Sequence, residues 1–138
     1  MNTPKKLEMM FQYARRYAFS ITVILTVVYL SLMNPPTRDI PYFPGWDKIV
    51  HFCMYGGVAG IIWLEYLFNH RKDRLHLKRG ILAAVVCPLL LGGLLEIGQS
   101  RLTAHRSGDW LDFAANTGGI VAAALIAWFI FRPRIMKK

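Results

Sequence analysis

The stretch DWLDFAANTGGIVAAALIAWFIF, residues 109–131, decides which kind of fold this chain can adopt. Its second half is apolar for long enough to reach across a bilayer, whose hydrocarbon core takes roughly 20 residues of helix. Its first half carries Asp109, Asp112 and Asn116 at steps of three and four residues, so these side chains share one helix face. An unpaired charge at the mouth of a membrane helix is costly. We therefore expect other helices to supply partners for this polar face.

Three more apolar segments of comparable length come before this one. More than half of the 138 residues are hydrophobic, yet the formal net charge is +9, a combination typical of a small membrane protein with basic loops. The sequence therefore predicts an all-α fold, a single integral membrane domain over residues 1–138 that forms a bundle of four transmembrane helices. Pro88 predicts a kink in the third helix. The expected helices cover about residues 17–33, 47–68, 80–99 and 109–131.

The cations predict how the bundle is oriented. With four spans, the N-terminal segment, the loop NHRKDRLHLKRG (residues 69–80) and the C-terminal tail all lie on one side. These segments hold every lysine and arginine except Arg38, Lys48, Arg101 and Arg106. The positive-inside rule then places both termini in the cytoplasm and turns the loops at 34–46 and 100–108 outward.

The same composition argues against other classes of protein. A basic chain can bind nucleic acid, but here the cations stand between long apolar runs, so we expect no nucleic-acid partner. Cys53 and Cys87 both fall within apolar runs, at depths that differ by roughly 10 Å at 1.5 Å per residue. We expect free thiols rather than a disulfide.

Polar faces recur at the outer ends of three predicted helices. In the second helix, Asp47, His51 and Tyr55 follow one another at steps of four, and in the third Glu96 and Gln99 are three apart. Because a carboxylate that faces lipid costs a few kcal/mol or more, we expect these faces to turn inward and meet the polar stripe of the last helix. The predicted pocket, open to the outer surface, is lined by Asp47, His51, Glu96, Gln99, Arg106, Asp109, Asp112 and Asn116.

Simpler explanations exist for part of this set. Asp47 and Asp109 both stand where a helix N-cap is expected, and Glu96 could form a structural pair with Arg101 or Arg106. His51 could be an interhelical hydrogen-bonding residue. Capping alone explains neither His51 nor Asn116, since each lies a turn or more inside its helix.

The ordered set of polar residues resembles the VanZ-like family of bacterial membrane proteins. The resemblance is carried by DKIVHFCMYGGVAG (residues 47–60) and EIGQSRLTAHRSGDWLDFAANTGGIVAAAL (residues 96–125), and it covers nearly all of residues 30–130. It departs from the family pattern in a longer outer loop between Gln99 and Asp109. The resemblance implies a role in the cell envelope, at the outer face of the bacterial cytoplasmic membrane, and a link to teicoplanin resistance, without specifying a reaction.

Three functions are compatible with such a pocket. The first is an intramembrane enzyme that acts on a lipid or a lipid-linked cell-wall substrate, because clustered carboxylates and a histidine can perform acid–base chemistry. The second is a non-catalytic binder of a lipid headgroup, a cell-wall precursor or a glycopeptide antibiotic, and the third is a small transporter. The sequence leaves the oligomeric state open.

Roles can be predicted for the individual side chains of the enzyme hypothesis. We expect His51 and Asp47 to form the acid–base pair, and Arg106 to hold a phosphate or carboxylate of the substrate. Glu96, Asp109 and Asp112 could hold a divalent metal ion such as Mg²⁺, Mn²⁺ or Zn²⁺. The expected catalytic residues are Asp47, His51, Glu96, Arg106, Asp109 and Asp112, and the expected substrate-binding residues are Lys48, Tyr55, Gln99 and Asn116.

Overall fold

The computed structural model describes residues 3–33, 44–102 and 110–137, and within these ranges the chain is helical and has no strand. The all-α prediction is confirmed. The described residues form four long helical segments. Two of these segments are α-helices interrupted by one π-helical turn. The elements are α1 (Thr3–Arg16), α2 (Ala18–Leu32), α3 (Trp46–Asn69), α4 (Leu77–Ile81), η2 (Leu82–Val86), α5 (Cys87–Leu102), α6 (Trp110–Ile126), η3 (Ala127–Phe131) and α7 (Arg132–Ile135).

Three of the long helical segments are long and apolar enough to cross a membrane. They are Trp46–Asn69, Leu77–Arg101 and Trp110–Ile135, with 24, 25 and 26 residues. Helix α2 is shorter, because its 15 residues reach about 22 Å at 1.5 Å per residue, less than the roughly 30 Å of a hydrocarbon core. The chain therefore has three candidate spans, or up to four if α1 and α2 together count as one bent span.

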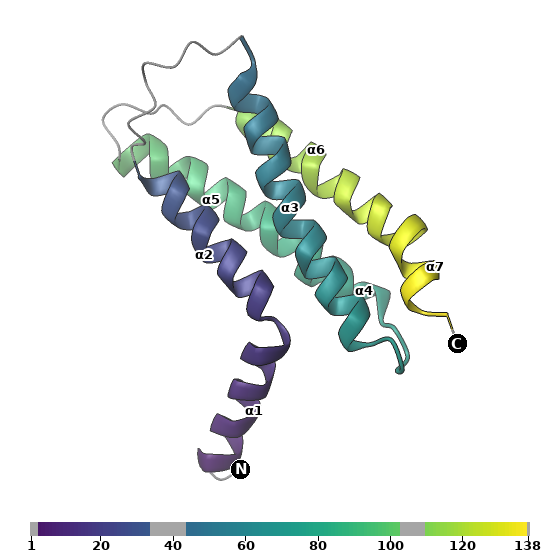
Figure 1. The fold of residues 1–138 in the computed structure, drawn as a ribbon. Helices are drawn as coiled ribbons and strands as arrows, with labels where there is room; N and C mark the ends of the chain where they lie inside the picture. The colour runs from purple at the N-terminus through teal and green to yellow at the C-terminus, as the bar shows by residue number, and fades with distance from the viewer. Residues whose placement is uncertain (1–2, 34–43, 103–109, 138) are drawn as a thin grey trace.

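Helix α1 differs from the sequence prediction, which had a basic segment leading into a helix at residue 17. The chain is helical from Thr3, and α1 meets α2 at an angle of 75° (Figure 1). Leu7, Met10 and Phe11 lie at helical spacing along α1, and all three are exposed. A strongly amphipathic helix that leaves the bundle at this angle is typical of a segment that lies in the membrane interface.

Each π-helical turn ends two residues before a proline. The amide of Cys87 donates to the carbonyl of Leu82, and the amide of Arg132 donates to that of Ala127, so both bonds span five residues instead of four. Pro88 and Pro133 follow directly. A proline lacks an amide hydrogen and its ring crowds the carbonyl four residues earlier, and the wider turn makes room for that ring. The irregularity predicted at Pro88 is therefore a π-helical turn.

Helices α3 and α6 form the centre of the bundle, with α5 and α2 packed beside α3 (Figure 1). The two central helices come together at Gly56 and Gly119. A methyl group at Gly119 would lie 2.1 Å from the carbonyl oxygen of Phe52, and one at Gly56 would lie 3.2 Å from the carbonyl oxygen of Gly119. Small residues let membrane helices approach closely, and this contact sets the register between the two helices that supply most of the polar cluster.

The basic segments gather at one end of the bundle. The turn after α3, the start of α4 and helix α7 lie at one end, together with the α1–α2 elbow (Figure 1). This end holds the basic segments 71–79 and 132–137. Asp47, Glu96 and Asp112 lie toward the opposite end of their helices. The predicted grouping of the basic segments at one end is observed, and their cytoplasmic location stays a prediction.

Candidate functional site

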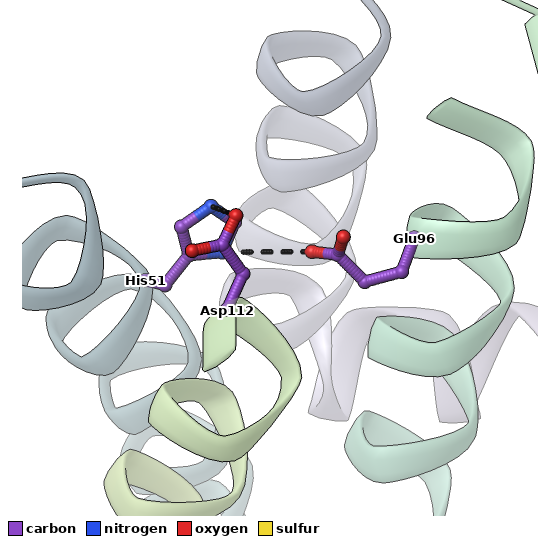
Figure 2. A group of neighbouring side chains, drawn as sticks. All are labelled: His51, Glu96 and Asp112. Carbon is purple, nitrogen blue, oxygen red and sulfur yellow. Dashed lines mark ion pairs between the residues drawn. The ribbon is translucent and has the colours of Figure 1, made fainter. Parts of the chain in front are cut away.

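His51 is the central residue of a polar cluster in which three helices meet. It comes from α3, whereas Asp112 comes from the first turn of α6 and Glu96 from α5 (Figure 2). The imidazole Nε2 lies 3.5 Å from Asp112 Oδ2, and Nδ1 lies 4.0 Å from Glu96 Oε1. The three side chains are only 12–16% exposed. The sequence prediction that polar faces from three helices converge is thus met for these residues.

Lys48 connects two carboxylates at the edge of this cluster. Its Nζ donates to Asp47 Oδ2 at 2.6 Å and to Asp112 Oδ1 at 2.5 Å. Asp112 is therefore held between a cation on one oxygen and the His51 ring on the other. A carboxylate with such partners keeps a fixed orientation, which is a condition for positioned chemistry.

The sequence predicted that Asp47 pairs with His51, but the structure places the Asp47 side chain elsewhere. It lies on the same helix as His51, four residues away, but its side chain turns to Lys48 and is 58% exposed. Within the described chain, the histidine meets Asp112 and Glu96 instead. Spacing along one helix shows that two residues share a face, but it does not show which partner each side chain meets there.

Asn116 and Tyr55 form the floor of the cluster. Asn116 is only 1% exposed, and its Oδ1 lies 3.0 Å from His51 Nδ1. Since an amide oxygen can only accept, this contact is a hydrogen bond when Nδ1 carries the ring proton, and Nε2 faces Asp112. Tyr55 is 2% exposed and packs with Asn116 around Gly92, where an added methyl would lie 3.2 Å from the tyrosine ring.

Gln99 joins α5 to the end of α2. Its Nε2 donates to the carbonyl of Ser31 at 2.7 Å, and both residues are buried. The contact satisfies a carbonyl in the last turn of α2, a group that has no partner within its own helix. This hydrogen bond gives Gln99 a structural role beside the cluster. Two other predicted site residues, Arg106 and Asp109, lie outside the described residues.

The cluster also has the composition of a divalent-cation site. One ligand atom from each of His51, Glu96 and Asp112 can be chosen so that all three lie within 4.8 Å of one another. Imidazole and carboxylate ligands together suit Zn²⁺ or Mn²⁺. The predicted set shares Glu96 and Asp112 with this one, and its third member, Asp109, lies outside the described residues.

Below the cluster the bundle is apolar. Side chains of α3 and α6 that follow toward the basic end are almost fully buried, and they are Val58, Ala59, Ile62, Trp63 and Ile120. Among the described residues, no polar side chain of this central layer continues the cluster through the bundle. The polar site is therefore closed on its inner side.

Glu65, for which the sequence predicted no role, lies at the α1–α2 elbow. Its carboxylate accepts hydrogen bonds from the amides of Phe19 and Ser20, at 3.0 and 2.9 Å, and from the Ser20 hydroxyl. Asn69, one turn further along α3, donates to the carbonyl of Arg16 at 2.9 Å. The signal was a carboxylate at the end of an otherwise apolar span, which is rarely without a partner.

Comparison with protein-family models, with curated proteins and with solved structures finds no match to this chain. A function for the chain therefore has to be inferred from the geometry of the cluster itself.

Proposed function

We propose that this chain is a membrane-embedded enzyme that acts on the polar end of a lipid or lipid-linked substrate. The observation that carries the proposal is the position of His51 between Asp112 and Glu96, on a closed floor, near one end of the bundle. A histidine flanked by two carboxylates can take and return a proton near neutral pH. A site at this depth meets headgroups rather than acyl chains.

Each side chain of the cluster has a role in this proposal. Asn116 orients the ring, so that Nε2 is the atom that accepts a proton from water or from a substrate hydroxyl. Asp112 lies next to that atom and stabilises the imidazolium that forms. Lys48 supplies a positive charge for a phosphate or carboxylate of the substrate, in exchange for one of its carboxylate partners.

The resemblance to VanZ-like proteins supports the same setting. It suggests the bacterial cytoplasmic membrane, with the cluster facing outward and a substrate drawn from cell-envelope synthesis. In that setting, the link to teicoplanin would follow from a change in the lipid-linked material that a glycopeptide meets. Arg106 and Asp109 stay predicted members of the site.

A bound divalent cation is a second proposal for the same cluster, favoured by the convergence of its three ligand groups. Both proposals use the same residues, and metal analysis of the purified protein tests the cation proposal. One equivalent of Zn²⁺ or Mn²⁺ that is lost in Asp112→Asn would assign the cluster to a metal ion. Transport is disfavoured by the apolar layer below the cluster.

The test is turnover of lipid by the purified protein. Wild-type protein is reconstituted in liposomes made from a total bacterial lipid extract, and the lipids are followed by mass spectrometry over time. We expect one lipid class to be converted, and His51→Gln and Asp112→Asn to slow that conversion roughly 10²–10⁴-fold, the usual contribution of a general acid–base group.

Asp73→Asn is the matched control, because it removes an exposed carboxylate from the opposite end of the bundle. It should convert lipid at the wild-type rate. All variants must also unfold at the wild-type temperature. Retention of one lipid class without any conversion, reduced in the cluster variants alone, would contradict the enzyme proposal and identify a binding protein.

A further inference from the structure

A hollow lies at the basic end of the molecule, away from the polar cluster. It has a volume of about 470 Å³ and opens where the α1–α2 elbow meets the last turns of α3. Ligand pockets in proteins span roughly 300–1,000 Å³. The residues that line it are Arg15, Arg16, Phe19, Ile61, Leu64, Glu65, Phe68 and Asn69.

The elbow that forms this hollow is fixed in place by α3. The Glu65 carboxylate accepts the amides of Phe19 and Ser20, which are donors at the start of α2 without partners in their own helix. Asn69 holds the carbonyl of Arg16 at 2.9 Å. Two side chains of one helix therefore bind the end of α1 and the start of α2, so the hollow is a defined part of the fold.

The charge of the hollow comes from its two arginines. Within the described part of the chain, neither Arg15 nor Arg16 has a carboxylate within ion-pair distance. The negative charge of Glu65 is directed to the amides of α2 instead. The remaining walls are apolar, formed by Phe19, Ile61, Leu64 and Phe68. Two exposed cations above an apolar wall match an anionic amphiphile.

We propose that this hollow binds an anionic phospholipid, with its phosphate on Arg15 and Arg16 and the upper part of an acyl chain along Phe19 and Leu64. A guanidinium pairs with a phosphate through parallel hydrogen bonds. The place of the hollow supports the same ligand, because α1 has the character of an interfacial helix and the other basic segments lie at this end. This inference does not depend on the function of the polar cluster.

The experiment measures lipid retention by native mass spectrometry. Full-length protein is incubated in detergent with phosphatidylglycerol or phosphatidylcholine, and the lipid-bound fraction is recorded against lipid concentration. We expect phosphatidylglycerol to bind preferentially. The double variant Arg15→Gln/Arg16→Gln should weaken its binding at least about tenfold, since each cation near a membrane surface contributes about a factor of five.

The matched control is Lys5→Gln/Lys6→Gln, which removes the same charge from the same helix but away from the hollow. It should leave binding within about twofold of wild type. Leu64→Trp fills the hollow while both arginines remain, and it should also weaken binding. Circular dichroism and unfolding temperature confirm that each variant is folded.

Three results would overturn the proposal. The first is equal retention of the two lipids, and the second is an equal loss in both double variants, which would indicate general surface charge. The third is displacement of the lipid by inorganic phosphate alone, which would indicate a simple anion site. His51→Gln should retain phosphatidylglycerol as wild type does, so a failed lipid test at the cluster leaves this result interpretable.

Discussion

His51 shows how a single buried amide can decide the chemistry of a site. Asn116 is nearly inaccessible and places its oxygen on one nitrogen of the imidazole, at 3.0 Å. The other nitrogen is then left for Asp112. The two ring atoms thus have separate tasks, one structural and one available for a proton, a substrate or a metal ion.

This arrangement predicts the tautomer of His51. In ¹⁵N-labelled protein, at a pH where the ring is neutral, we expect Nδ1 to carry the proton and Nε2 to be bare. Asn116→Ala should remove this preference, because the hydrogen-bond acceptor is lost. The signal is assigned by its disappearance in His51→Gln, and the exposed His76 serves as the internal reference for an unconstrained ring. A wild-type ring with the proton on Nε2 would contradict the assignment.

Much of the cluster could be predicted at this scale, because helical spacing shows which residues share a face. Asp112 and Glu96 were correctly placed near His51 on that basis. The pairing of His51 with Asp47 could not be checked by spacing, since the competing partners lie on other helices. Which carboxylate is nearest depends on the register between α3, α5 and α6, and a single sequence carries no direct signal of it.

At the scale of the elements, the register between α3 and α6 depends on contact between backbones. The carbonyl of Phe52 lies where a side chain at residue 119 would start. Only glycine fits there, and the contact brings the outer turns of both helices close enough for Lys48 to reach Asp112. A packing feature in the apolar region therefore positions the polar residues above it.

Substitution of Gly119 by alanine should separate the two helices. The new methyl group would stand 2.1 Å from the Phe52 oxygen, so we expect the free energy of unfolding to fall by about 1–3 kcal/mol, measured by unfolding in mixed detergent micelles. Gly57→Ala is the control, because a methyl group there meets nothing within 4 Å and alanine favours the helix. Equal effects of both substitutions would show that helix propensity, not helix contact, is decisive.

Helix α1 could not be predicted from hydropathy alone. Long apolar runs indicate the spans, and the four expected helices lie close to the observed bounds, although α2 alone is too short to be a candidate span. A search for long apolar runs does not detect a helix whose apolar residues occupy only one face. The spacing of Leu7, Met10 and Phe11 was the available signal. The bend after Arg16 had no comparable signal, because its cause is the carboxylate of Glu65, far along the chain.

For the whole molecule, the gathering of the basic segments at one end predicts its topology. Single cysteines are introduced into a cysteine-free background and treated with a membrane-impermeant maleimide in intact cells. We expect Arg38→Cys to be labelled, and Lys5→Cys, Asp73→Cys and Lys137→Cys to react only after permeabilisation, because basic segments stay in the cytoplasm.

The position of Lys5 is the informative one in this experiment. Labelling of Lys5→Cys in intact cells, with the other three results as expected, would mean that α2 does not span and that the bundle crosses the membrane three times. Labelling of Asp73→Cys would show that the orientation is the opposite of the predicted one, with the polar cluster at the cytoplasmic face.

The two side chains that hold the ends of α2 have a consequence for how the chain is assembled. Its first turn is completed by Glu65 and its last by Gln99, residues that leave the ribosome 45 and 68 positions after the groups they satisfy. Until both have entered the bilayer, the ends of α2 must be hydrated or held by the insertion machinery. Helix α2 thus takes its final place only when α5 arrives, and premature arrest of translation before Gln99 would leave a segment exposed to quality-control proteases.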